Sequence, residues 1–75
     1  MNDEPSSQEQ QEYLEKIGRY VRGVRHELEY TRLRLAEELS VSVDVIISVE
    51  NAETDIQTAT YLFNRVRALL RNRLN

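Results

Sequence analysis

Apolar residues recur at alternating steps of three and four between Leu14 and Leu28, and this spacing limits what the chain can fold into. An α-helix has about 3.6 residues per turn, so such steps place the apolar side chains on one face. The series is Leu14, Ile17, Val21, Val24 and Leu28. A capping box, Ser6-x-x-Glu9, precedes it. The pattern predicts a long amphipathic first helix.

Two glycines, Gly18 and Gly23, interrupt this predicted helix. In a helix interior each glycine costs on the order of 1 kcal/mol relative to alanine, because glycine loses more backbone freedom on folding. Their presence therefore indicates either close packing against another element or a soft spot in the helix.

Two short helices joined by a tight turn are predicted next. Thr31 is a candidate N-cap for the second helix, and Ser42 is one for a third helix of residues 43 to about 50. Residues 40–42 form the turn between them. The inward-facing residues of this pair are Leu35, Ala36, Leu39, Ile46 and Val49.

A last helix follows the polar loop NAETD and a second capping box, Thr54-x-x-Gln57. Its predicted core face consists of Ile56, Ala59, Phe63, Val66 and Leu70. Leu62, Leu69 and Leu74 lie beside that stripe and widen it. Because a face this broad exceeds what one small core needs, it predicts a homodimer interface on the last helix.

The chain has 75 residues and no cysteine, which predicts one small domain without a disulfide or a thiolate metal site. We expect a disordered acidic N-terminus over residues 1–7 and a single helix-turn-helix domain over residues 8–75. No apolar run approaches the roughly 18 residues of a membrane span, and the acidic start is unlike a signal peptide. We expect a cytoplasmic protein without a cofactor, a metal or a membrane partner.

The net charge of −3 is unevenly distributed along the chain. Residues 1–15 hold five acidic residues and no basic one, whereas the remainder holds ten basic residues against eight acidic ones. The folded part is therefore mildly basic. This is weaker than the strongly basic surface usual for DNA binding, so charge alone decides nothing about function.

The stretch IGRYVRGVRHELEYTRLRLAEELSVSVDVIISVEN resembles the Cro and phage-repressor (XRE-type) helix-turn-helix family, over roughly residues 17–70. The matching positions are Arg25, Thr31, Leu35, Ala36, Leu39, Val41, Ser42, Ile46, Val49, Glu50 and Asn51. The resemblance implies an all-α, repressor-like bundle of four to five helices whose helix-turn-helix places residues 43–50 in the DNA major groove. It also implies a structural ion pair between Arg25 and Glu50.

The resemblance further implies a set of DNA-contacting positions. They are Arg32, Arg34, Ser42, Val43, Asp44, Ile47, Ser48 and Asn51. Arg32 replaces the family's glutamine and favours a bidentate phosphate contact. Ser40 and Ala52 replace glycines of the family pattern, so the backbone there either avoids positive φ or carries mild strain.

The predicted base-reading positions are unusual for a DNA-binding helix. Asp44 and Ser48 can hydrogen-bond base edges, and Val43 and Ile47 can touch thymine methyl groups, but no arginine or glutamine is available for a bidentate base contact. The acidic Asp44 also repels phosphate. Sequence readout should therefore be weak, or depend on DNA shape.

The sequence favours a small dimeric DNA-binding regulator, such as a repressor, a Cro-like protein or an antitoxin. Eight arginines would supply phosphate contacts: Arg19, Arg22, Arg32, Arg34, Arg65, Arg67, Arg71 and Arg73. The alternative is a helix-turn-helix fold used for protein contact, as in an antirepressor or antiactivator. That alternative depends on the apolar Val43, Ile47 and Leu33 beside Asp44.

An enzyme is not expected. One histidine and no cysteine provide no nucleophile and base pair, and no metal cluster, with a recognisable spacing. Double-stranded DNA and a second copy of the chain are the expected partners, with a protein docking on residues 43–50 as the alternative.

Overall fold

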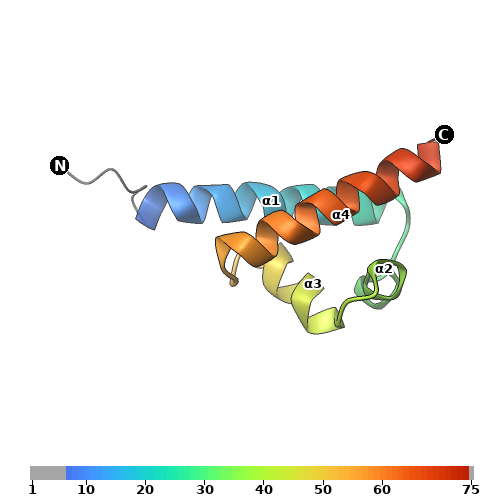
Figure 1. The fold of residues 1–75 in the computed structure, drawn as a ribbon, viewed down its shortest axis with the longest axis horizontal. Coiled ribbons are helices and arrows are strands. Elements are labelled where there is room, and N and C mark those ends of the chain that lie inside the picture. The colour runs from blue at the N-terminus through green and yellow to red at the C-terminus, as the bar shows by residue number, and fades with distance from the viewer. Residues whose placement is uncertain (1–6, 75) are drawn as a thin grey trace.

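The computed structural model describes residues 7–74 except the side chain of Leu74, and it is all-helical over that range. The helices are α1 (Ser7–Glu27), α2 (Arg32–Leu39), α3 (Val43–Glu50) and α4 (Ile56–Leu74) (Figure 1). The predicted all-α fold with four helices is confirmed. Most of the segment predicted to be disordered, including Ser6 of the first capping box, lies outside the described residues, whereas Ser7 already belongs to α1.

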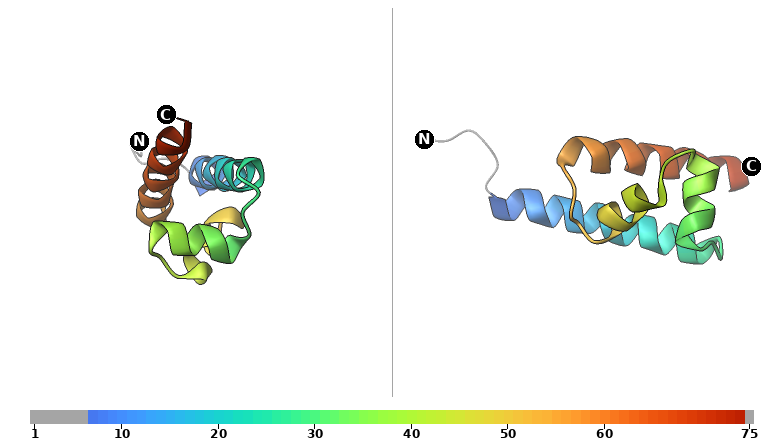
Figure 2. Two further views of the ribbon diagram at one scale, coloured as in Figure 1. Left: turned by 90° about the vertical axis from the view of Figure 1, so that its right-hand side faces the viewer. Right: turned by 90° about the horizontal axis from the view of Figure 1, so that it is seen from below.

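The two long helices, α1 and α4, pack side by side and run in the same direction (Figures 1 and 2). The short pair α2 and α3 covers one side of them, and a tight turn at residues 40–42 joins the pair. α3 packs against both α1 and α2. The first turns of α1 extend beyond the start of α4, so they project from the bundle.

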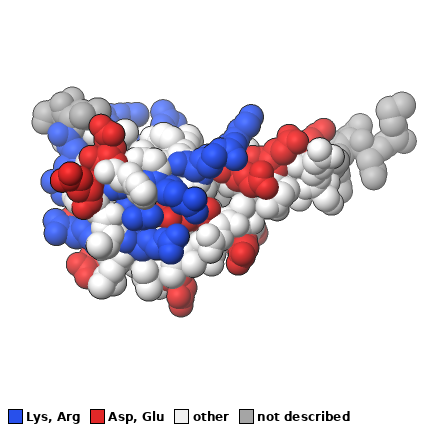
Figure 3. Space-filling model, turned by 180° about the vertical axis from the view of Figure 1, so that it is seen from behind, with Lys and Arg blue, Asp and Glu red and all other residues white. Residues whose placement is uncertain are grey.

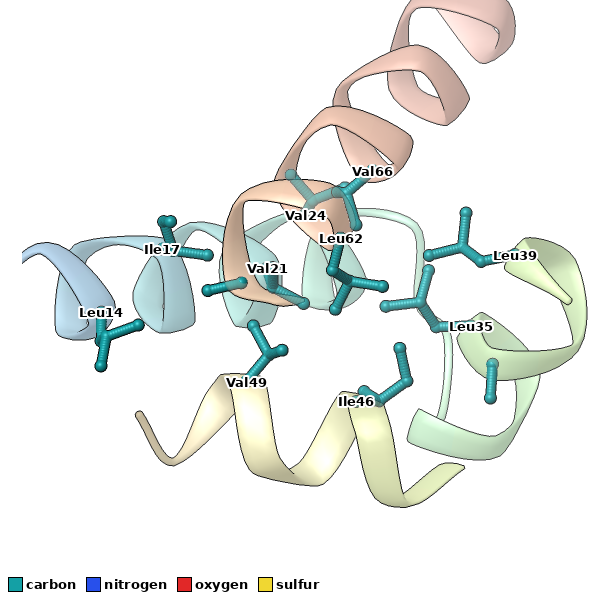
Figure 4. Close-up of a cluster of buried hydrophobic side chains, with 12 residues drawn as sticks. Leu14, Ile17, Val21, Val24, Leu35, Leu39, Ile46, Val49, Leu62 and Val66 are labelled. Atoms are coloured by element: carbon teal, nitrogen blue, oxygen red, sulfur yellow. The ribbon is translucent and has the colours of Figure 1, made fainter. Parts of the chain in front are cut away.

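The core lies between all four helices (Figure 4). Its buried apolar residues are Leu14, Ile17, Val21, Val24, Leu35, Ala36, Leu39, Ile46, Val49, Ala59, Leu62 and Val66. The predicted inward faces of the first three helices are confirmed, apart from Leu28, which is only partly buried.

The core face of α4 differs from the prediction. Leu62 is completely buried, whereas the predicted core residues Phe63 and Leu70 are only partly buried. Ala59, Leu62 and Val66 are separated by steps of three and four residues, so together they form the helix face that points inward.

The N-termini of α2, α3 and α4 differ in whether and how a side chain caps them. The Thr31 hydroxyl accepts a hydrogen bond from the Arg34 amide at 3.0 Å, as predicted. Ser42 occupies the N-cap of α3, but its side chain makes no capping hydrogen bond. The predicted capping box before α4 is wrong, because α4 begins one residue after Asp55, whose carboxylate accepts from the Thr58 amide at 3.3 Å.

Each of the first three helices is followed by a non-glycine residue with positive φ. The φ angles are 58° at Glu29, 56° at Ser40 and 57° at Ala52. The amide after Ser40 bonds back to the Ala36 carbonyl at 3.0 Å, which is typical of a left-handed helix end. The backbone at Ser40 and Ala52 therefore does not avoid positive φ, and these two residues carry the mild strain that was the second alternative.

Candidate nucleic-acid interface

The C-terminal end of α3 is held by a buried ion pair. The Glu50 side chain is completely buried, and Arg25 on α1 donates to it twice, from Nε to Oε2 at 2.7 Å and from Nη2 to Oε1 at 3.1 Å. Arg25 Nη1 also donates to the Tyr30 carbonyl at 3.1 Å. The predicted pair is therefore confirmed, and it joins α1, the loop after α1 and α3.

Two further arginines converge on the same carboxylate, which the sequence did not reveal. Arg32 donates from Nε to Glu50 Oε1 at 3.1 Å, and Arg22 Nε lies 3.6 Å from the same atom. Their side chains are 41% and 47% exposed, respectively. With Arg25, three guanidinium groups surround one carboxylate, which leaves an excess of positive charge at this surface.

Only part of the Arg32 side chain is used by Glu50. Its Nη1 and Nη2 groups make no hydrogen bond within the described part of the chain. The Arg22 contacts are long, since Nη2 lies 3.4 Å from the Glu50 carbonyl oxygen. Both arginines therefore hold donors that can bind an anion from outside.

Burial and ion pairing have opposite effects on the Glu50 carboxyl. Burial alone would raise its pKa, but the hydrogen bonds and charges of Arg25 and Arg32 outweigh this effect and hold the pKa below its usual range. Glu50 is therefore ionised at neutral pH. An ionised, fully paired Glu50 fixes the position of α3 against α1.

Gly18 lets α1 approach this end of α3 closely. A Cβ atom at Gly18 would lie 2.7 Å from the Val49 carbonyl oxygen and 2.8 Å from that of Glu50. At Gly23 an added Cβ would meet nothing within 4 Å. Of the two predicted explanations, close packing therefore applies to Gly18, whereas Gly23 has no close neighbour.

Of the predicted base-reading residues, Asp44, Ile47 and Ser48 share one side of α3 by their helical spacing. Ser42, Asp44 and Asn51 are exposed, whereas Val43, Ile47 and Ser48 are half-buried. Val43 packs against the core, so it offers less surface than the sequence suggested. The exposed polar groups of this face are one acid, one hydroxyl and one amide, and α3 has no Lys or Arg.

Arg34, a predicted DNA contact, belongs to a cluster of side chains with the end of α4. It donates from Nε to Glu38 Oε1 at 3.0 Å, which raises its pKa, and its guanidinium lies 5.1 Å from the centre of the Tyr30 ring. Arg73 also stacks on Tyr30, hydrogen-bonds its hydroxyl and lies 3.6 Å from Glu38. The four-residue spacing of Arg34 and Glu38 is the sequence signal that could have revealed this pair.

The predicted dimer residues on α4 are not together on its surface. Leu62 is fully buried in the core of its own chain, so it cannot contact a second copy, and its assignment to the interface is wrong (Figure 4). Leu69 is half-buried and packs against the core. The side chain of Leu74 lies outside the described residues. Large apolar side chains are instead exposed at Leu33 (58%) and Tyr61 (52%).

On the face shown in Figure 3, the projecting part of α1 differs in charge from the rest of the molecule. Acidic side chains cover the projecting N-terminal part of α1, whereas basic side chains gather over the middle of the same face. Some predicted phosphate contacts are used internally. Arg65, for example, donates to the Tyr61 hydroxyl at 2.8 Å and to the Leu39 carbonyl at 2.9 Å.

The described part of the chain offers no pocket, and no group of three or more His, Asp or Glu side chains there could hold a metal ion. None of its helices combines the length and the apolar character needed to cross a membrane. Comparison of the chain with protein-family models, with curated proteins and with solved structures yields no match.

Proposed function

We propose that this chain is a small transcriptional regulator that binds double-stranded DNA as a homodimer through α2 and α3. The observation that carries the proposal is the asymmetry of α3. Its end at Glu50 is fixed by the Arg25 ion pair, while Ser42 and Asp44 at its other end stay exposed. A helix held firmly at one end and open on its outer face is what insertion into a groove requires.

A phosphate contact would come from Arg32, at the Glu50 end of α3. Its side chain is 41% exposed and keeps unpaired donors, and the surrounding cluster has an excess of positive charge. DNA carries about one negative charge per 1.7 Å of helix axis, so its phosphate backbone attracts this basic surface whatever the base sequence is. The resemblance to XRE-type proteins supports the same assignment for Arg32.

Base recognition would be limited. Asp44 can accept from a cytosine amine, Ser48 can bond to several base edges, and Ile47 can contact a thymine methyl group. None of these gives the bidentate contact that usually dominates specificity. We therefore expect a small difference in affinity between a target sequence and other DNA, with DNA shape contributing to it. Such a regulator would act in the cytoplasm, where we expect the chain to meet its DNA.

A salt series tests the proposal. Binding of a duplex from upstream of the chain's own gene, measured by fluorescence anisotropy, should weaken steeply with salt because phosphate contacts release counterions. Arg32→Ala should lower the slope of log K against log salt by about one. Lys16→Ala removes the same charge from an exposed position on α1 that is not among the predicted phosphate contacts, and it should leave that slope unchanged. A folded chain without salt-dependent binding would contradict the proposal.

One observation favours the alternative, a helix-turn-helix fold that binds a protein. Leu33 on α2 is 58% exposed, and the neighbouring helix α3 presents Asp44 but no basic side chain. An antirepressor or antiactivator would use such a surface to mask a regulator. This alternative predicts no DNA binding in the salt series. It also predicts that Leu33→Ser weakens partner binding, whereas DNA affinity is insensitive to this change if the first proposal is right.

A further inference from the structure

The outward face of α1 carries a stripe of six exposed side chains. These residues, called here the α1 stripe, are Gln8, Glu12, Glu15, Arg19, Arg22 and His26. Steps of four and three residues keep them on one helix face, opposite the core series. Figure 3 views this side of the molecule, with the acidic part of α1 followed by the basic part.

The charged residues of the α1 stripe lie at equal separations before and after Ile17, with acidic residues before it and basic residues after it. Glu15 and Arg19 lie two residues before and after it, and Glu12 and Arg22 lie five residues before and after it. Suppose that a second copy of α1 lies antiparallel on the stripe, with the two-fold axis at the height of Ile17 along the helix. Each glutamate of the stripe then faces an arginine of the other copy. A parallel arrangement in register would instead bring like charges together, which is unfavourable.

The side chains at the centre of the stripe are available for such a contact. The side chains of Glu15 and Arg19 make no hydrogen bond or ion pair with any other residue that the structure describes. Arg22 keeps about half of its surface exposed despite its contacts with Glu50. Gly23 lies beside the stripe, and the open space above it lets another helix approach closely.

We propose that two copies of the chain associate antiparallel through the α1 stripe, with Glu15 of each copy paired to Arg19 of the other and Glu12 paired to Arg22. The partner is a second copy of the chain, because the acidic half of the stripe is complementary in charge to its basic half. DNA would be repelled by the acidic half. The interface refines the homodimer of the proposed function and replaces the α4 interface, from which Leu62 is excluded by its burial.

An interface of exposed ion pairs is weak and sensitive to salt, since such pairs are screened and compete with water. Glu15 and Arg19 are also four residues apart in one helix, so they could instead attract each other within a single copy. A charge-reversal experiment separates these two arrangements, because only the pairing between copies depends on which chains are mixed.

The experiment uses Glu15→Arg and Arg19→Glu in the full chain. In a homodimer either change sets like charges against each other at the centre of the stripe. In a mixed dimer of the two variants, the arginine introduced in one copy would face the glutamate introduced in the other. The unchanged Arg19 of the first copy would face the unchanged Glu15 of the second, so both central pairs are restored. Pairing within one helix predicts no gain on mixing.

Sedimentation equilibrium at low salt measures the association without DNA. We expect the wild-type chain to dimerise, each single variant to dimerise at least about tenfold more weakly, and their equimolar mixture to regain wild-type association. Glu37→Arg, the same charge change at an exposed site on α2, should associate like wild type. The double variant Glu15→Arg/Arg19→Glu should also recover, which checks that the single variants fail by charge and not by folding.

A monomeric wild-type chain, or a mixture that associates no better than the single variants, would overturn the α1 stripe as an interface. Because no DNA is present, such a result would leave DNA binding by α2 and α3 untouched. Conversely, loss of DNA binding in the salt series would not affect the dimer.

Discussion

The two ends of α3 differ in how they are held. At the C-terminal end Val49 and Glu50 are buried, Gly18 lies against their carbonyl groups, and three arginines surround one carboxylate. At the N-terminal end Ser42 is exposed without a side-chain cap, and Asp44 points to solvent. The difference indicates that buried polar contacts fix the Glu50 end, whereas the other end, although Val43 and Val45 pack against the core, keeps exposed polar side chains that can meet a partner. Changes at the two ends should therefore have different consequences.

Glu50→Gln should have the largest effect on stability. The change removes the charge that Arg25 needs, and Arg25 is only 13% exposed at its side chain. Breaking a buried ion pair by removing one partner costs about 3 to 5 kcal/mol. Urea unfolding followed by circular dichroism should show a loss of that size. A loss below about 1 kcal/mol would contradict a structural role for this end of α3.

The contribution of Glu50 to the stability of the fold should depend on pH. Because the pKa of Glu50 is lower in the folded chain than in the unfolded one, its ionised form stabilises the fold at neutral pH. That contribution is complete above the unfolded carboxyl pKa of roughly 4.3 and is lost as the pH falls through the lower folded pKa. The stability difference between wild type and Glu50→Gln should therefore shrink in acid. A constant difference from pH 7 to pH 2 would exclude this linkage.

Gly18→Ala and Gly23→Ala form a matched pair within one helix. The Cβ at Gly18 meets backbone oxygens of α3 that cannot move cheaply, so we expect a destabilisation of about 1 to 3 kcal/mol. The Cβ at Gly23 meets nothing, so the better helix propensity of alanine should stabilise the chain by about 0.5 to 1 kcal/mol. Thermal unfolding of both variants measures the difference. Equal effects would mean that α1 does not press on α3.

Thr31→Ala and Ser42→Ala compare a used cap with an unused one. Thr31 accepts a hydrogen bond from the Arg34 amide, so its loss should cost about 1 kcal/mol. Ser42 makes no capping bond, and its replacement should change stability by only a few tenths of a kcal/mol. Denaturant unfolding distinguishes the two. A cost at Ser42 equal to that at Thr31 would show that the N-terminal end of α3 is capped after all.

Much of this fold could be predicted from the sequence, because helical spacing and caps are local signals. The apolar face of α1 and the Thr31 cap were predicted from such signals and are present. The Arg25–Glu50 pair is also present, but it was implied by the family resemblance and not by a local signal. The core face of α4 could not be settled in this way. The apolar residues of α4 form a broad stripe on one side of the helix. Only packing against α1 and α2 decides that Leu62, and not Phe63, is fully buried.

The candidate interface was harder to predict because long arginine side chains can reach several partners. Arg32 and Arg34 both begin α2, yet one turns toward Glu50 and the other toward Glu38 and Tyr30. The Arg34–Glu38 pair has the four-residue spacing of a local helical pair, but the direction of Arg32 depends on where α1 and α3 place their side chains, which no local pattern records. The same limit applies to Arg22, whose contact with Glu50 spans 28 residues of sequence.

The most direct test of the division within α3 is NMR spectroscopy of the labelled chain during titration with duplex DNA. We expect shifts of the backbone amides of Ser42 to Ser48 and of the Arg32 side-chain Nε–H, with much smaller shifts at Gly18 and Val49. A duplex of unrelated sequence should shift the arginine signal about as much, and those of α3 less. Shifts that avoid α3, or no shifts at low salt, would contradict the claim that the free end of α3 meets DNA.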